Sequence, residues 1–143
     1  MNATPTIAEH PAVALVREFL DASMAPDPER AARCMDEGAR IVFTGGREMP
    51  DVAAVTAFNA ARYRRVKKAL GAFDCVERDG RAIVYATGTL HGEWPDGRAF
   101  AGNRYVDRYE VVDGRIVRMD VWNDSAERLL DPSLDGAGPD AVA

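Results

Sequence analysis

Apolar residues recur at helical spacing at the start of the chain. Between Ile7 and Met24 they fall on one helix face, at Val13, Val16, Phe19 and Leu20. This spacing predicts an amphipathic first helix that ends before the breaker run Pro26-Asp27-Pro28.

Two further helices are expected, with Asp27 and Asp51 as their N-caps. The second begins at Pro28 and stops at Gly38. The third follows Asp51 and runs on to Gly71, because residues 52–66 keep an apolar stripe. Between these helices, residues 40–44 predict a short strand and residues 45–50 an ordered loop.

After Gly71 the pattern changes to period two, which is typical of strands. Turn signals at Asp79-Gly80, Pro95-Asp96-Gly97 and Asp113-Gly114 separate four expected strands, over residues 72–78, 81–94, 98–112 and 115–123. Residues 125–130 predict a last helical turn. The order predicts an α+β fold, a curved antiparallel sheet with helices on its concave face, enclosing a ligand-sized pocket.

Length and composition set limits on this picture. A chain of 143 residues suits one domain, predicted over residues 7–130 with flexible termini at 1–6 and 131–143. The net charge of -5 argues against nucleic-acid binding. Two cysteines without a CxxC pair predict neither a disulfide framework nor a metal site. No membrane or export segment is visible, so we predict a cytoplasmic protein.

One basic run interrupts the acidic composition. Residues 62–68 read RYRRVKK. Such a run could bind a phosphate or carboxylate, but it is more often the solvated end of a helix, where cations also favour the helix dipole. We adopt the second interpretation.

Residues 103–124, NRYVDRYEVVDGRIVRMDVWND, resemble the closing hairpin of the SnoaL-like polyketide cyclase branch of the nuclear transport factor two-like superfamily. The resemblance rests on the turn Asp113-Gly114-Arg115-Ile116, on Asp124 eight residues beyond Ile116, and on the order of elements over residues 10–130. Within that branch, residues 103–115 are also similar to phenazine-biosynthesis A/B-type proteins. Likeness at this level supports the fold better than the activity.

The resemblance implies a cone-shaped, cystatin-like domain, usually a homodimer formed through the outer face of the sheet. Its pocket would perform acid–base chemistry on hydrophobic small molecules without a metal or nucleotide. Cyclases, isomerases, epoxide hydrolases and dehydratases share this fold with non-catalytic binders, so a reaction type does not transfer.

Three positions depart from the family pattern. Many relatives carry an acidic residue five positions after the Ile of the turn, where this chain has Val121. Relatives of the limonene epoxide hydrolase type carry an Arg and an Asp on the long second strand, at positions aligned with Gly88 and Leu90. These departures argue against that hydrolase mechanism and leave either a redesigned pocket or a lost activity.

Strand alternation brings Asp107 forward as a catalytic candidate. Charged residues mark one face of strand 98–112 as outward, which places Asn103, Tyr105 and Asp107 on the inward face. Burying an unpartnered polar group costs roughly 2–7 kcal/mol, so such groups are satisfied or functional. Partial burial would raise the pKa of a carboxyl toward that of a general base. Alternatively, Asp107 binds a buried Tyr, Trp or helix N-terminus and only holds the layers together.

Neighbouring residues complete the predicted site. The Tyr105 phenol could donate to a developing oxyanion, or it could be a core aromatic with its hydroxyl at the rim. Asn103 and Asn123 could orient a carbonyl or hydroxyl. The remaining substrate-binding candidates form the lid and the apolar wall: Phe58, Tyr63, Ile41, Phe43, Leu90, Met119, Val121 and Trp94.

Arg62 and His91 are weaker candidates. Arg62 could point inward and pair with Asp107 or grip an acidic substrate, although outward solvation is the more ordinary outcome. Alternation places His91 on the outward face, at the surface or in a dimer contact, unless a bulge reverses it. Trp122 shares that outward face and suits a contact between two sheets.

Two hypotheses of function follow. The first is a cofactor-independent enzyme of small-molecule metabolism, with secondary metabolism expected. It would be of isomerase or lyase type and would cyclise, isomerise or dehydrate a hydrophobic oxygenated substrate by proton transfer. The second is a small-ligand-binding or dimerisation module without catalysis, which Val121 in place of an acid favours.

Overall fold

A computed structural model describes residues 9–136. The helices and strands follow one another as α1 Pro11–Met24, α2 Pro28–Arg33, β1 Met35–Phe43, η1 Thr44–Gly46, β2 Arg47–Met49, α3 Val52–Arg62, β3 Arg65–Arg78, β4 Arg81–Glu93, β5 Ala99–Val112, β6 Arg115–Asn123, α4 Ser125–Leu130 and η2 Pro132–Gly136. The predicted flexible segment 1–6 and the expected helix start at Ile7 lie outside the described residues. Of the predicted flexible segment 131–143, residues 137–143 lie outside them too, and residues 132–136 form η2.

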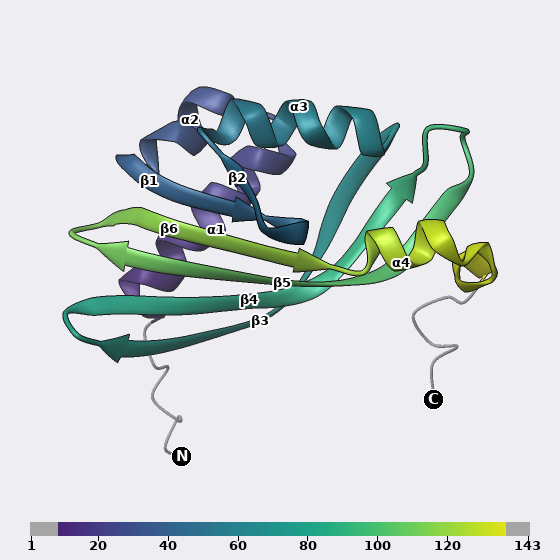
Figure 1. Cartoon of the computed structure of the whole chain (residues 1–143). Coiled ribbons are helices and arrows are strands. Elements are labelled where there is room, and N and C mark those ends of the chain that lie inside the picture. The colour runs from purple at the N-terminus through teal and green to yellow at the C-terminus, as the bar shows by residue number, and fades with distance from the viewer. Residues whose placement is uncertain (1–8, 137–143) are drawn as a thin grey trace, which may run out of the picture.

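The strands form one curved, open sheet in the order β2-β1-β6-β5-β4-β3. Helices α1, α2 and α3 gather on one side of it, while α4 lies at one end (Figure 1). This confirms the predicted α+β class and helical cover. The sheet is not wholly antiparallel, because β1 runs parallel to β6, with Ile41 opposite Met119. The main core lies between α1 and the sheet, where Val16, Phe19 and Tyr109 are buried.

Both predicted acidic N-caps are present. An Asp27 carboxylate oxygen accepts a hydrogen bond from the Arg30 amide at 3.1 Å, and one from Asp51 accepts from the Ala54 amide at 2.8 Å. The first helix begins at Pro11, with the His10 ring accepting from the Ala12 amide at 3.1 Å. Each cap satisfies an amide that the first turn of a helix leaves unpaired.

The hairpin turns are also where the sequence predicts them. Asp79 and Gly80 have φ of 53° and 76°, and Asp113 and Gly114 have φ of 50° and 74°. Two consecutive residues in the left-handed region define the turn that suits the twist of a two-residue hairpin. The two turns fix the register of β3 with β4 and of β5 with β6.

The first strand and its surroundings differ from prediction. The second helix ends at Arg33 instead of Gly38, and β1 begins at Met35 instead of residue 40. The cause is tertiary: the Ile116 amide donates to the Cys34 carbonyl at 2.8 Å, and Met35 pairs with Ile116. The expected loop 45–50 is a 3₁₀ turn followed by β2, which pairs with β1.

The third helix was predicted too long. It ends at Arg62, and β3 already begins at Arg65, seven residues before the expected strand start at residue 72. Pairing with β4 explains this, since Lys68 lies opposite Leu90 and Val66 opposite Gly92. The basic run 62–68 is therefore mostly strand and not a helix end. This change brings Lys68 to the concave side, while the exposed Lys67 reaches the Met24 carbonyl at the end of α1.

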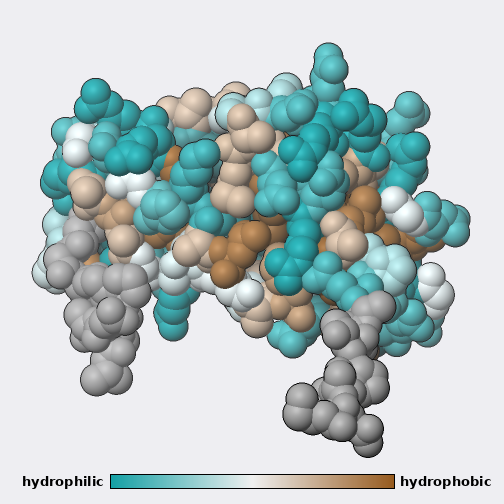
Figure 2. Space-filling view, turned by 180° about the vertical axis from the view of Figure 1, so that it is seen from behind, coloured by the Kyte–Doolittle hydropathy of each residue, from teal (hydrophilic) through white to brown (hydrophobic). Residues whose placement is uncertain are grey.

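The opposite side of the sheet carries interlocked charges. Arg118 binds the Asp120 carboxylate at 2.8 Å, and Arg108 lies 3.2 Å from Glu110. In the view from behind, hydrophilic side chains cover much of the molecule, with hydrophobic surface visible between them near the centre (Figure 2). No helix within residues 9–136 has the length and apolar character that a bilayer crossing requires.

Candidate functional site

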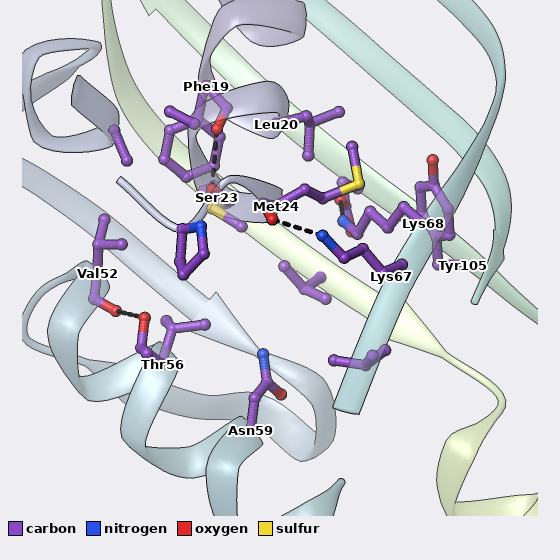
Figure 3. A pocket seen from close by; sticks show the side chains of 18 of the residues that line it. Phe19, Leu20, Ser23, Met24, Val52, Thr56, Asn59, Lys67, Lys68 and Tyr105 are labelled. Carbon is purple, nitrogen blue, oxygen red and sulfur yellow. Dashed lines mark hydrogen bonds and ion pairs between the residues drawn. The ribbon is translucent and has the colours of Figure 1, made fainter. Parts of the chain in front are cut away.

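A cavity of about 470 Å³ lies between the sheet and helices α1–α3. This volume falls within the range of small-molecule sites. Apolar side chains dominate its wall, and polar ones occur at a few positions (Figure 3). The predicted site residues on the wall are Ile41, Phe43, Tyr63, Leu90, Tyr105, Asp107, Met119, Val121 and Asn123.

Asp107 is fully buried on the cavity wall. One carboxylate oxygen, Oδ2, accepts a hydrogen bond from Lys68 Nζ and another from the Tyr109 hydroxyl at 3.1 Å. The other, Oδ1, has no hydrogen-bond partner within residues 9–136. Two hydrogen bonds therefore hold Oδ2 in place, and Oδ1 can still accept one.

Lys68 is the cation that makes this burial possible. Its side chain is 20% exposed and forms an ion pair with Asp107. Its Nζ also lies 4.3 Å from the centre of the Tyr105 ring, in cation–π geometry. An unpaired charge in such a place would cost several kcal/mol, so the ammonium and the carboxylate stabilise each other. Lys68, and not Arg62, is therefore the partner of Asp107.

Tyr105 is buried one pleat from Asp107 on the same strand. Its hydroxyl also has no hydrogen-bond partner among the described residues. Burial, and then the nearby Asp107 charge, raise the pKa of Tyr105 to about 12. The phenol therefore stays protonated at neutral pH and can act only as a neutral hydrogen-bond donor or acceptor.

A second polar group lies beside the cavity around Ser125, at the start of α4. The Ser125 hydroxyl accepts from the Tyr63 hydroxyl at 2.5 Å and from Asn103 Nδ2 at 3.2 Å. Asn123 accepts from the Ser125 amide at 3.1 Å through its side-chain oxygen. Asn103 is fully buried but does not line the cavity. Its side chain therefore holds Ser125 in place and does not contact a ligand in the cavity.

Three aromatic candidates differ in position. Phe43 lines the cavity, whereas Phe58 packs edge-on behind it, with ring centres 5.3 Å apart. Trp94, predicted at the pocket mouth, is buried and stacks on Tyr63 and Phe100, with its ring centre 4.2 Å from that of Phe100. Phe58 and Trp94 therefore support the wall from outside.

The two weaker candidates do not reach the cavity. Arg62 is half-buried and lies over the rings of Phe58 and Tyr63, at 5.1 and 5.6 Å from their centres. His91 is exposed, opposite Ala101 on the neighbouring strand. A bulge does occur between Leu90 and His91 in the pairing with β5, but Leu90 still lines the cavity.

A family model described as the SnoaL-like domain matches residues 16–119 of the chain. The chain belongs to the SnoaL-like domain family. No curated protein matches its sequence.

Solved structures share the fold of this SnoaL-like protein. A nuclear transport factor two-like protein of unknown function from Burkholderia pseudomallei K96243 has 19% identity and a TM-score of 0.69, over 85% of this chain and 97% of the other. TerC, crystallised with polyporic acid, has 18% identity and a TM-score of 0.67, over 85% and 97%. A protein from Jannaschia sp. CCS1 named as a SnoaL-like polyketide cyclase has 18% identity and a TM-score of 0.64, over 94% and 96%.

The SnoaL-like pocket here differs from the expected pattern in a simple way. The family resemblance expects a carboxylate at position 121, and the chain has Val121 on the cavity wall. In the pairing of β5 with β6, Val121 lies directly opposite Asp107. Side chains opposite each other on one sheet face have Cβ atoms about 4.5–5.5 Å apart. A carboxylate is therefore present at the expected level of the SnoaL-like cavity, but on the neighbouring strand.

Sequence reasoning missed several polar residues of this SnoaL-like site. Lys67 and Lys68 were assigned to a helix end, and Asn59 and Ser125 were not considered. The alternation of Val66, Lys68 and Leu70 was a usable signal for the strand. Ser125 gave none, because its role depends on where α4 meets β5. Within residues 9–136, no group of three or more His, Cys, Asp and Glu side chains could hold a metal ion.

Proposed function

We propose that this SnoaL-like protein is an enzyme of secondary small-molecule metabolism that moves a proton on a hydrophobic oxygenated substrate with its own side chains. The observation that carries the proposal is the fully buried Asp107, which has a cation on one oxygen and an unpartnered second oxygen beside a cavity of about 470 Å³. Buried carboxylates with one free acceptor are suited to general base catalysis.

The roles follow from the contacts. Asp107 Oδ1 would take a proton from a carbon next to a substrate carbonyl, and the Tyr105 hydroxyl would donate to the carbonyl oxygen as negative charge develops there. Lys68 would hold the carboxylate in place and balance its charge. The resulting enolate could attack a second carbonyl, be reprotonated at another carbon, or expel a hydroxide. These outcomes are cyclisation, isomerisation and dehydration.

The test needs a ligand first. A thermal-shift screen over aromatic polyketides and acidic metabolites identifies molecules that stabilise the folded chain by mass action. Each hit is then incubated in D₂O, and exchange of the hydrogens next to its carbonyl is followed by NMR. We expect exchange with the wild type and a loss of about 10²–10⁴-fold in Asp107→Asn, the usual contribution of a general base.

The matched control is Thr56→Val, on the cavity wall in α3. The Thr56 hydroxyl bonds the Val52 carbonyl at 3.1 Å, so its removal leaves Asp107 and its partners untouched. This variant should exchange at the wild-type rate. Asp107→Asn with full exchange activity would show that Asp107 is not the base.

A non-catalytic ligand-binding module is the second candidate function. The two hydrogen bonds on Asp107 Oδ2 and the apolar Val121 favour it, because both could serve a wall built only for binding. Hits that bind the wild type without any hydrogen exchange would support this candidate over the enzyme.

We also propose a homodimer formed through the outer face of the sheet. Trp122 is 53% exposed there, and it lies opposite Val106, which is 37% exposed. A large aromatic beside an apolar neighbour on a solvent-facing sheet is typical of an interface core.

A further inference from the structure

Two consecutive lysines of β3 border the cavity, and only one of them is neutralised. Lys68 pairs with Asp107. Lys67 donates to the Met24 carbonyl at 2.8 Å and forms no ion pair with a carboxylate in the described part of the chain. The remaining carboxylate on the wall, Asp27, accepts from the Arg30 amide as the cap of α2.

The Lys67 ammonium has N–H donors that make no described hydrogen bond. An ammonium carries three N–H groups, and its one described hydrogen bond goes to the last residue of α1. Helix carbonyls at that end attract a cation, so this contact sets where the ammonium lies. Two donors are left for another acceptor.

Asn59 offers a second set of donors. It is half-buried on α3, lines the cavity, and its side-chain amide makes no hydrogen bond within residues 9–136. Figure 3 shows Asn59 and Lys67 extending from opposite elements, α3 and β3, into the same space. Apolar residues such as Val52 and Leu20 line the same cavity, and the Lys67 side chain reaches it from an exposed position at the cavity's edge.

We propose that Lys67 and Asn59 form an anion subsite, so that the ligand of this pocket is a hydrophobic molecule carrying a carboxylate or an equally acidic oxygen. Lys67 supplies the charge and Asn59 a neutral donor. The claim that this ligand is also the substrate rests on the proposed function, since its oxygenated end would then lie toward Tyr105 and Asp107. Binding of an anion at Lys67 and Asn59 does not depend on the proton-transfer role of Asp107.

A pair of probes of nearly equal shape, one anionic and one neutral, tests the subsite. Naphthalene carboxylate and naphthalene carboxamide have nearly the same shape, and their dissociation constants are measured by calorimetry at neutral pH. We expect the wild type to bind the carboxylate about tenfold more tightly or better, the usual strength of a charged hydrogen bond. Lys67→Gln should reduce this preference to near one, and Lys67→Arg should retain it.

Asn59→Asp is a second, independent variant. It changes one atom of the amide and places a carboxylate where we expect the anion, which should abolish the preference although Lys67 is intact. Thermal unfolding of each variant shows whether the fold survives, because Lys67 also caps α1. If Lys67→Gln fails to fold, Asn59→Asp still tests the subsite.

Equal binding of the two probes by the wild type would overturn the subsite, as would failure to bind either at millimolar concentration. A carboxylate preference that survives Lys67→Gln would also overturn it and point to Lys68 instead. The two proposals fail separately: wild-type hydrogen exchange in Asp107→Asn ends the proton-transfer role without affecting the anion preference, whereas equal probe binding ends the subsite without affecting exchange.

Discussion

The Tyr105 ring lies in the space that a side chain at Gly88 would occupy. The two residues face each other across β4 and β5. A Cβ at position 88 would lie 2.8 Å from the Tyr105 hydroxyl oxygen and 2.3 Å from the Ala69 carbonyl oxygen. The missing side chain thus allows both a close approach of β3 and the inward position of the phenol.

Gly88→Ala is expected to destabilise the fold and displace Tyr105. Overpacking of this kind costs about 1–3 kcal/mol, and the backbone contact at Ala69 favours the upper part of that range. Urea unfolding gives the free energy of unfolding. Gly38→Ala is the control, because its Cβ would meet only the Asp36 carboxylate at 3.4 Å, so a change within about 0.5 kcal/mol is expected. Equal effects of the two substitutions would contradict the crowding described.

Removal of Lys68 should be more harmful than removal of the whole ion pair. Lys68→Met leaves the buried Asp107 charge without its cation, which costs about 3–5 kcal/mol when a pair is fully buried and somewhat less here, since Lys68 is 20% exposed. The double variant with Asp107→Asn should recover much of that loss. A double-mutant cycle in urea measures the coupling. Additive effects would mean that the pair contributes nothing.

High pH should destabilise the protein through its buried tyrosines. Burial, and then the Asp107 charge, raise the pKa of Tyr105 to about 12 and that of Tyr109 well above its usual value. In the unfolded chain tyrosine titrates near pH 10, so the folded state holds these protons more tightly. This stabilisation is complete below about pH 10 and is lost as the pH rises through about 12.

The variant Tyr105→Phe isolates one part of that loss. Two pKa units correspond to about 3 kcal/mol, so the free energy of unfolding of the wild type should fall by up to that much more than that of the variant between about pH 10 and 12. Urea unfolding at several pH values provides both slopes. Parallel slopes would show that Tyr105 is not buried as described.

Local chemistry explains which parts of the fold were predictable. The turns Asp79-Gly80 and Asp113-Gly114 require positive φ, and the caps Asp27 and Asp51 bind amides three residues away. Such features depend only on neighbours in sequence. The parallel pairing of β1 with β6 depends on residues far apart, and the start of that strand was missed for this reason.

The largest error in the predicted secondary structure concerned residues 63–71. Because of it, Lys67 and Lys68 were left out of the predicted site. Helical and strand periods both fit Tyr63 and Val66, and lysines are good helix formers. The segment forms a strand because it pairs with β4, where Lys68 lies opposite Leu90. A lysine on an inward strand face is unfavourable unless an acidic partner neutralises its charge. Asp107 and Lys68 are each anomalous alone, and recognising both as one buried ion pair would have indicated that residue 68 lies on an inward-facing strand.

Trp122→Glu should separate the proposed dimer without unfolding the protomer. The indole is 53% exposed on the outer sheet face, so a charge there costs the isolated chain little. At the centre of an interface, the same charge would be buried twice across the symmetry axis and would repel its copy. Light scattering after size-exclusion chromatography should give a dimer mass for the wild type and a monomer mass for the variant. Leu130→Glu, on α4 with 81% exposure, is the control and should stay dimeric. A wild-type monomer at high micromolar concentration would refute the interface.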